Sequence, residues 1–349
     1  MTAPPDPDVR VALIGYGLGG AAFHAPLIAC TPGMRLATIV TSNAQRRARA
    51  AREHPRASIV DSAQAVWDRA RDHDVVVIAT SNDAHAPLAL AALAAGLAVV
   101  VDKPFAVRVA DARKVLEEAR RRKLLLTVYH NRRWDGELLT VKRLLAENAL
   151  GDVLRFESRL ERWRPDLKGG WRERGAPEAG GGLLYDLGTH LIDQALHLFG
   201  PVTHVYAELD RRRPGMQVDD DTFLALTHAS GVRSHLAATY VSAQPLPRMR
   251  VLGSRGAYLK VHGDVQEAAL RAGERPDRPG WGEEPREHWG VLGVGDAAVP
   301  VRSEPGAYQH FYAKIVAALR DGALPPVDPE DAIAGLEIIE IAQRYISGP

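Results

Sequence analysis

Cysteine is almost absent from the chain, since Cys30 is the single one among 349 residues. An intrachain disulfide is therefore impossible, and a zinc site built on cysteines lacks its ligands. An excess of one charge is missing too, because 44 Lys and Arg residues face 43 Asp and Glu residues, for a formal net charge of +1. This balance gives no general attraction to nucleic acid or to an anionic membrane, so we expect neither as a partner.

Long hydrophobic runs are missing as well. No apolar stretch approaches the roughly 20 residues of a membrane span, and the polar, proline-rich start Met1–Asp8 lacks the regions of a signal peptide. We therefore expect a soluble, cytoplasmic protein. With 46% hydrophobic and 25% charged residues the composition is that of a globular protein. The length exceeds what one core usually supports, so we expect two domains.

The first third of the chain alternates short apolar runs with helical patterns. Runs such as Val75–Ala79 are typical of strands buried on both faces. Strands separated by helices predict a parallel sheet with right-handed crossovers. The expected strands are Val9–Ile14, Arg35–Val40, Val75–Ala79, Leu97–Val101 and Leu124–Tyr129, and the expected helices are Ala21–Cys30, Ala44–Glu53, Pro87–Ala95 and Ala110–Arg122.

The pattern changes near His130. After a helix over Gly136–Glu147, alternating stretches follow one another with short turns, which favours an antiparallel sheet. The expected strands are Val153–Trp163, Val202–Asp210, Thr222–Ala229, Ser234–Val241, Arg248–Leu252 and Ala257–Val261. Two helices, Ala307–Arg320 and Pro329–Tyr345, close the chain.

A glycine-rich turn joins the first expected strand to the first helix. Gly15, Gly17 and Gly20 fit G-x-G-x-x-G, with Leu18 among them. In such a turn the first glycine permits the bend, the second lets the backbone approach a pyrophosphate, and the third lets helix and strand pack. The free N–H groups of the helix then face the phosphates. The strand–helix context supports a dinucleotide site over the alternative, a glycine-rich turn without a ligand.

The end of the second strand bears on the choice of cofactor. NAD sites usually place an acid there to bind the ribose 2′-hydroxyl, whereas this chain reads Thr41-Ser42-Asn43-Ala44-Gln45-Arg46-Arg47. Ser42 can bond a 2′-phosphate, and Arg46 or Arg47 can pair with its charge. We therefore predict NADP, with NAD as the other possibility. The alternative for the arginines is a solvated helix face.

Lys103, in Asp102-Lys103-Pro104, directly follows a buried strand. The C-terminal ends of parallel strands line the ligand crevice, so this lysine would stand near a nicotinamide. A partly buried lysine suits proton exchange with a hydroxyl or a carbonyl. The alternative is a surface lysine at the end of a strand.

A second cluster follows the glycine run at 180–182. On a helix, Asp186, His190, Asp193 and His197 share one narrow face. Three interpretations stay open for this face. It is a solvated polar stripe, a metal site of imidazoles and carboxylates, or an acid–base site. In the last case the histidine takes a hydroxyl proton while hydride leaves the carbon.

Taken together, these motifs resemble the Gfo/Idh/MocA oxidoreductases. The resemblance covers nearly the whole chain and includes the glycine turn, Thr80-Ser81-Asn82 with His85, Asp102-Lys103-Pro104 and the helix with Asp186, His190 and Asp193. Phe23-His24-Ala25-Pro26-Leu27-Ile28, Val101-Asp102-Lys103-Pro104-Phe105, His130-Asn131-Arg132-Arg133-Trp134-Asp135 and Trp171-Arg172-Glu173 are similar, more narrowly, to that family's NADP-dependent scyllo-inositol 2-dehydrogenases. The family's usual Glu-Lys-Pro is Asp-Lys-Pro here, so the acid is one methylene shorter.

The resemblance implies a fold class of α/β plus α+β. It implies an N-terminal Rossmann domain with a parallel sheet, over residues 1–130, and a C-terminal mixed domain with a large, mainly antiparallel sheet, over residues 131–349. The face of that second sheet often joins subunits, so a homodimer or homotetramer is expected.

The resemblance also implies the site residues. Lys103, Asp186 and His190 match the catalytic lysine, the substrate-binding aspartate and the general acid/base histidine. Cofactor contacts are expected from Gly15, Gly17, Leu18, Gly20, Ser42, Arg46, Arg47, Thr80, Asn82, His85, Asp102, Lys103 and Asn131. Substrate contacts are expected from Asn131, Arg132, Trp163, Trp171, Asp186 and His190, and no metal is expected.

The expected activity is reversible hydride transfer between NADP(H) and a secondary alcohol of a cyclic polyol, inositol or sugar. Each hydroxyl of such a substrate needs a polar partner once water is excluded. Two alternatives share the fold: a glycoside hydrolase that retains NAD, and a catalytically silent NADP-sensing regulator. The basic end of the second strand disfavours the first, and the retained Lys103, Asp186 and His190 disfavour the second.

Overall fold

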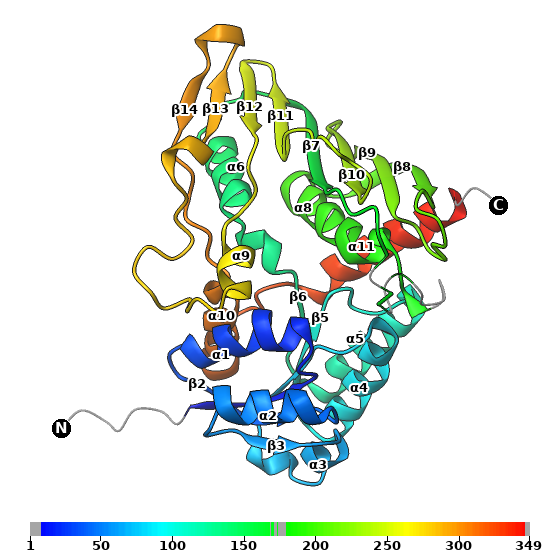
Figure 1. Ribbon diagram of the computed structural model, residues 1–349, viewed down its shortest axis with the longest axis vertical. Coiled ribbons are helices and arrows are strands. Elements are labelled where there is room, and N and C mark those ends of the chain that lie inside the picture. The colour runs from blue at the N-terminus through cyan, green and yellow to red at the C-terminus, as the bar shows by residue number, and fades with distance from the viewer. Residues whose placement is uncertain (1–7, 168, 171–172, 174–178, 346–349) are drawn as a thin grey trace.

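The computed structural model describes residues 8–167, 169–170, 173 and 179–345. Two sheets organise this part of the chain (Figure 1). The first has six strands, all parallel, in the order β3-β2-β1-β4-β5-β6, which confirms the expected Rossmann sheet. Its strands are β1 Val9–Ile14, β2 Met34–Val40, β3 Ser58–Val60, β4 Val75–Ile78, β5 Ala98–Asp102 and β6 Leu126–Tyr129. Its helices are η1 Gly19–His24, α1 Ala25–Cys30, α2 Ala44–Glu53, α3 Gln64–Trp67, η2 Ala70–Asp72, α4 Asn82–Ala94 and α5 Val109–Arg122.

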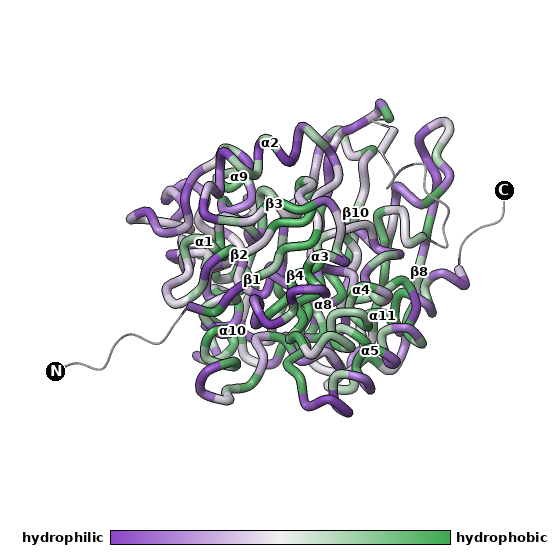
Figure 2. The backbone as a smooth tube through the Cα atoms, turned by 90° about the horizontal axis from the view of Figure 1, so that it is seen from below, coloured by the Kyte–Doolittle hydropathy of each residue, from purple (hydrophilic) through white to green (hydrophobic). Residues whose placement is uncertain are grey.

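The β-branched run of β4 is apolar throughout because both of its faces are covered. Val75 and Val77 belong to one hydrophobic core, while Val76 and Ile78 belong to another on the opposite side of the sheet. Alternating side chains of one strand thus fill two cores. Figure 2 shows the hydrophobic strands β1 and β4 in the interior and the hydrophilic helix α2 at the rim.

Two helices begin elsewhere than the sequence pattern predicted. The expected helix Ala21–Cys30 is divided into a π-helical turn, η1, and the α-helix α1. Pro26 lies in the first turn of α1 and has no N–H to donate to a preceding carbonyl, so a regular helix cannot run through it unchanged. The expected helix Pro87–Ala95 starts earlier, at Asn82, with Pro87 inside it, so placing its start at the proline was wrong.

The second sheet has eight strands in the order β14-β13-β12-β11-β7-β10-β9-β8. Only the β7–β10 pair is parallel, so the expectation of a mainly antiparallel sheet is confirmed. The strands are β7 Val153–Glu161, β8 Val202–Asp210, β9 Asp221–His228, β10 Arg233–Thr239, β11 Met249–Gly253, β12 Gly256–Lys260, β13 Gly290–Gly293 and β14 Val299–Val301. The last two were not predicted from sequence, because they are short and carry glycine or proline.

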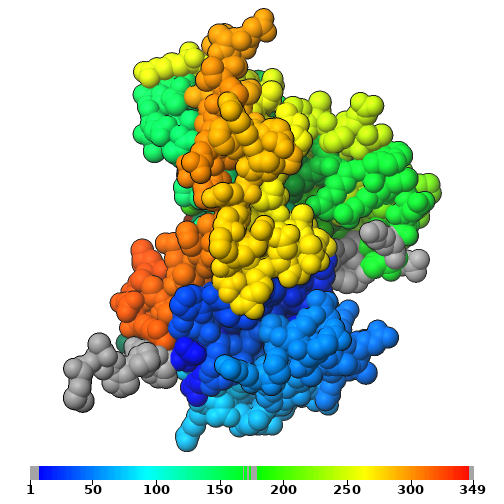
Figure 3. Space-filling view, turned by 60° about the vertical axis from the view of Figure 1, so that its left-hand side comes forward, coloured from blue at the N-terminus to red at the C-terminus, as the bar shows by residue number. Residues whose placement is uncertain are grey.

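Helices from the later part of the chain tie the two sheets together. These are η3 Asn131–Trp134, α6 Gly136–Ala146, η5 Leu184–Gly188, α8 Thr189–Phe199, α9 Gln266–Arg271, η6 Arg286–His288, η7 Gly295–Ala297, α10 Gln309–Asp321, α11 Pro329–Ala342 and η8 Gln343–Tyr345. Helix α10 packs beside α1, and α11 lies between α5 and α8. Figure 3 shows the segment around α9, in yellow, resting on the blue N-terminal residues. None of the helices described combines the length and apolar character needed to cross a bilayer.

Candidate active site

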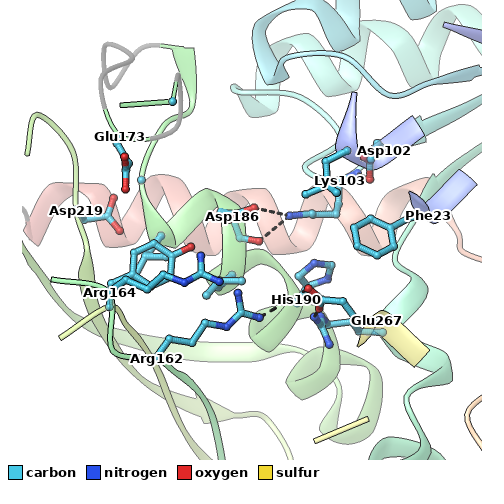
Figure 4. Close-up of a pocket in the computed structure, with 18 of the residues that line it drawn as sticks. Phe23, Asp102, Lys103, Arg162, Arg164, Glu173, Asp186, His190, Asp219 and Glu267 are labelled. Atoms are coloured by element: carbon cyan, nitrogen blue, oxygen red, sulfur yellow. Dashed lines mark hydrogen bonds and ion pairs between the residues drawn. The ribbon is translucent and has the colours of Figure 1, made fainter. Parts of the chain in front are cut away.

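A cavity of about 350 Å³ opens between the two sheets. Residues that follow β1, β5 and β6 form one side of its wall, and η5, α8 and the segment after β7 form the other (Figure 4). It therefore lies at the carboxyl ends of the parallel strands, where open α/β sheets bind their ligands. Predicted site residues in its lining are Leu18, Asp102, Lys103, Asn131, Arg132, Asp186 and His190.

Lys103 and Asp186 meet in this cavity. Lys103 Nζ donates hydrogen bonds to Asp186 Oδ1 at 3.0 Å and to the Asp186 main-chain oxygen at 2.7 Å. The Lys103–Pro104 peptide is cis. Asp219 holds the start of the turn that carries Asp186, because its carboxylate accepts a hydrogen bond from the Leu184 N–H at 2.7 Å. The two stretches that the sequence identified separately therefore converge on one space.

His190 lies one helical turn beyond Asp186 and also lines the cavity. It is buried, and its Nδ1 has no hydrogen-bond partner in the described part of the chain. Burial, followed by the charges of Lys103 and Arg132, pushes the pKa of His190 well below its ordinary 6.5. The imidazole is therefore neutral near pH 7 and can accept a proton.

Asp102 connects the end of β5 to the glycine turn. Its Oδ1 accepts a hydrogen bond from the Lys103 N–H at 2.8 Å, and its Oδ2 lies 3.6 Å from His24 Nε2. Burial opposes its ionisation, but the adjacent His24 ring and the Lys103 ammonium outweigh burial and hold the pKa of Asp102 at about 2. A fixed negative charge thus stands behind the lysine.

The glycine turn has the shape that a dinucleotide requires. Gly15 has a φ of +100°, and a Cβ there would lie 2.3 Å from the Ala79 carbonyl oxygen. A Cβ on Gly20 would lie 1.9 Å from the Gly15 oxygen. At Gly17, by contrast, a Cβ would meet only Arg46 Nη1 within 4 Å, at 3.7 Å, among the described atoms. The first and third glycines are needed for packing, and the second leaves room for a ligand, so the turn fits a pyrophosphate.

The three residues predicted to bind a 2′-phosphate lie at the surface beside this turn. The side chain of Asn43 caps α2 by accepting the Arg46 N–H at 3.0 Å. Arg47 Nη1 lies 3.7 Å from Asp61 Oδ2, whereas Arg46 forms no ion pair within the described ranges. Ser42 and Arg46 are exposed. Arg46 is therefore the cation available to an added anion.

Two predicted cofactor residues are occupied by structural contacts. Asn82 Nδ2 donates to the Gly180 carbonyl at 2.8 Å, and His85 Nδ1 lies 2.8 Å from the Pro104 oxygen. Both are buried and neither lines the cavity. Thr80 Oγ1 donates to the Ser81 oxygen at 3.3 Å and is also outside the lining. Asn82 and His85 support the walls of the cavity, since they hold the glycine run and the Lys103–Pro104 segment.

Of the predicted substrate residues, Asn131 and Arg132 line the cavity, and Trp171 lies outside the described residues. Trp163 is 57% exposed and is not in the lining. The extended chain here points alternate side chains to opposite faces, so Arg162 and Arg164 face inward while Trp163 faces solvent. The contact that the resemblance implied for Trp163 stays a prediction, and the structure places its two neighbours in the lining instead.

The predicted polar stripe, which runs from Asp186 on η5 to His197 on α8, is not one site. Asp193 is buried and pairs with Arg133 at 2.7 Å, while His197 Nε2 lies 3.1 Å from Lys142 Nζ on the outside. Only Asp186 and His190 reach the cavity. Within the residues that the structure describes, no group of three or more His, Cys, Asp or Glu side chains is placed to hold a metal ion.

Several lining residues were not predicted from sequence. They include Phe23, Arg162, Arg164, Arg213, Asp219, Tyr240, Glu267 and Arg271. The alternation Arg162-Trp163-Arg164, just after β7, was the signal from which the two arginines could have been predicted. The rest come from loops whose approach to the cavity depends on tertiary packing.

Comparison with known proteins identifies the family. The model of the oxidoreductase family with an NAD-binding Rossmann fold matches residues 9–130, and that of the GFO/IDH/MocA C-terminal domain matches residues 138–259. The chain belongs to the Gfo/Idh/MocA oxidoreductases. Residues 9–130 therefore form an NAD(P)-binding Rossmann unit.

Individual members of this family are similar to the chain over nearly its whole length. The oxidoreductase YdgJ of Escherichia coli is 41% identical over 96% of this chain and 95% of its own. The scyllo-inositol 2-dehydrogenase (NADP(+)) IolW of Bacillus subtilis is 33% identical over 96% of this chain and 93% of its own. The solved structure of a Yersinia pestis oxidoreductase is 40% identical, with a TM-score of 0.89, and covers 98% of this chain and 97% of that one.

Proposed function

We propose that this oxidoreductase uses NADP(H) to interconvert a secondary alcohol of a cyclic polyol, inositol or sugar with the corresponding ketone or lactone. The observation that carries the proposal is the meeting of Lys103 and Asp186 beside a neutral His190 in one cavity. The family likeness to IolW supports the substrate class.

The chemistry divides between the cofactor and the protein. A bound nicotinamide supplies the hydride acceptor or donor. In the oxidative direction His190 accepts the hydroxyl proton, because its imidazole is neutral. Lys103 donates a hydrogen bond to the same substrate oxygen, and Asp186 orients that ammonium and accepts from a neighbouring hydroxyl. In reduction, the protonated imidazole returns the proton to the forming alcohol.

The preference for NADP rests on the end of β2. Ser42 and Arg46 are exposed beside the glycine turn, and the turn itself lies close to Arg46. The nearest acid along the sequence, Glu53, is engaged by Tyr16 and Arg49 at 2.8 Å each. A 2′-phosphate would thus meet a cation, whereas residues 41–47 offer no carboxylate to a 2′-hydroxyl. We also propose that a face of the second sheet joins subunits into a homodimer or homotetramer.

The test is a matrix of initial rates. Purified protein is offered NADP or NAD with scyllo-inositol, myo-inositol, D-glucose and D-galactose, and NADPH or NADH with the matching ketones, while absorbance of the reduced cofactor is followed. We expect turnover with NADP(H) on at least one polyol pair. Absence of any turnover, or release of free sugar from a glycoside without net cofactor change, would contradict the proposal.

A further inference from the structure

Arginine and carboxylate side chains share the wall of the cavity opposite the glycine turn, and two of the arginines, Arg162 and Arg164, stand out by their pairing. Arg162 and Arg164 follow β7, and their main-chain N–H groups donate to the Thr239 and Tyr240 oxygens at 2.9 and 2.8 Å, which continues the pairing with β10. This pairing holds the segment extended, so both side chains point into the cavity. In Figure 4 they extend from the β7 side towards Asp186 and His190.

The charges of these two arginines are poorly matched by carboxylates. Among the described residues Arg162 has one acidic partner, Glu267, at 3.8 Å. That single carboxylate also bonds Arg132 and Arg271, so three guanidiniums share it. Arg164 forms no ion pair with any described residue, and its guanidinium stacks over the Tyr240 ring at 5.0 Å.

The neighbouring Arg213 shows the contrast. It donates to Asp220 at 2.8 Å and to Glu173 at 3.1 Å, so its charge is satisfied within the fold. For Arg162, burial and the nearby Arg164 and Arg132 lower the pKa below its ordinary value, although Glu267 opposes this. Arg162 and Arg164 are both half-buried, and among the described residues they lack a full complement of carboxylates, so their partial removal from water costs free energy. A fold that retains such a pair in a ligand cavity is ready to receive an anion.

We infer that Arg162 and Arg164 bind an anionic oxygen group, a carboxylate or a phosphate, on the polyol or sugar substrate. The inference rests on the proposed function, because it extends the same cavity. Guanidinium groups suit both anions, since their planar N–H donors match paired oxygens. The acidic substrate would be held at its far end by the arginines, with a hydroxylated carbon left beside His190.

The experiment compares neutral and acidic substrates of matched stereochemistry. Values of kcat/KM are measured for D-galactose, D-galacturonate and D-galactose 6-phosphate in the native enzyme and in the Arg164→Met and Arg162→Met variants. We expect an acidic substrate to exceed the neutral one. Each variant should lose about tenfold to a hundredfold on the acidic substrate, as for a charged hydrogen bond, and less than about threefold on the neutral one. The two acidic substrates distinguish carboxylate from phosphate.

Controls separate charge recognition from folding. Arg35→Met removes an exposed arginine from β2, outside the cavity, and should leave all three values unchanged. Arg164→Lys should recover part of the acidic preference, and thermal unfolding should show each variant folded.

A binding measurement tests whether the two arginines hold an anion, without requiring turnover. Calorimetry of D-galactarate on the native enzyme saturated with NADPH should show binding that the double variant loses. If neutral polyols are turned over while acidic ones are neither preferred nor bound, the anion site is wrong and the proposed function stands. If no polyol of any charge is turned over, the proposed function fails, and the binding arm still decides whether the arginines hold an anion.

Discussion

The ammonium of Lys103 bonds Asp186 twice, through the carboxylate at 3.0 Å and the main-chain oxygen at 2.7 Å, across 83 residues of sequence. The contact joins the end of β5 to η5 and so fixes the Rossmann unit against the second sheet at the cavity. It also places a positive charge near His190, which helps to keep that imidazole neutral. The Lys103–Asp186 ion pair therefore both stabilises the arrangement of the two units and favours the neutral imidazole that the expected reaction needs.

Replacing His190 should remove the proton acceptor. In His190→Asn we expect kcat to fall about 10²- to 10⁴-fold, as is typical for loss of a general base. The dissociation constant for NADPH, measured by fluorescence, should stay within about threefold. His197→Asn, two turns along the same helix and outside the cavity, is the matched control and should retain activity. Equal losses in both variants would argue against the assigned role.

The pH dependence of oxidation follows from the neutral imidazole. Because the pKa of His190 lies well below 6.5, its base form persists on acidification. We expect kcat/KM for the alcohol to stay level from pH 8 to below pH 6.5 and to decline only at lower pH. The measurement is a rate profile in buffers of constant ionic strength. An acid limb centred at pH 6.5 or higher would show a histidine in an ordinary environment.

Choice of cofactor should depend on Arg46. Removing its charge in Arg46→Ala should lower kcat/KM for NADP by about tenfold and leave the value for NAD almost unchanged, because only NADP carries the 2′-phosphate. Arg52→Ala is the control. It removes the same charge, but Arg52 lies at the other end of α2, away from the glycine turn. A preference that survives Arg46→Ala, or that Arg52→Ala alters equally, would contradict this assignment.

Two glycine-to-alanine changes should have opposite outcomes. A Cβ at Gly20 would lie 1.9 Å from the Gly15 oxygen, so Gly20→Ala must displace main chain in the turn. We expect a loss of several kcal/mol in the free energy of unfolding or an insoluble product. A Cβ at Gly335, within α11, approaches only Ile192 Cγ2 at 3.8 Å, so Gly335→Ala should be neutral or stabilise by up to about 1 kcal/mol. Urea unfolding of both variants checks the contrast.

A buried pair of carboxyl groups should make stability depend on pH. Burial raises the pKa of Asp135 and of Asp264 to about 7, from 3.8. Well below pH 3.8 both are protonated in folded and unfolded chains. As the pH rises towards 7 only the unfolded chain releases the protons, so their contribution to stability is lost over that interval.

Asp264→Asn should therefore flatten the stability profile between about pH 4 and pH 7, by up to a few kcal/mol in the free energy of unfolding. Urea midpoints at each pH measure it. Asp111→Asn, an exposed carboxyl on α5, serves as the control and should leave the slope unchanged. A native profile parallel to that of Asp264→Asn would refute the raised pKa.

Local pattern was enough to predict much of the fold. The β-branched runs, the glycine turn and the alternating later strands predicted a parallel sheet followed by a mainly antiparallel one, and both are confirmed. These features depend on neighbours in sequence, since the period of apolar residues and the demands of a tight turn are local properties. The short β13 and β14 were missed, because their pairing depends on a distant partner more than on their own residues.

Which side chains line the cavity, and how they pair there, depends on the tertiary structure. The sequence by itself determined that Lys103, Asp186 and His190 were candidates, but not that Asp193 would turn to Arg133 or that Asn82 would bond Gly180. Nor could it show that three arginines share Glu267 while Arg164 has no acidic partner in the described chain. These pairings depend on which side chains, remote in sequence, lie next to one another in the folded chain. Burial and charge pairing in the cavity are therefore properties of the tertiary packing.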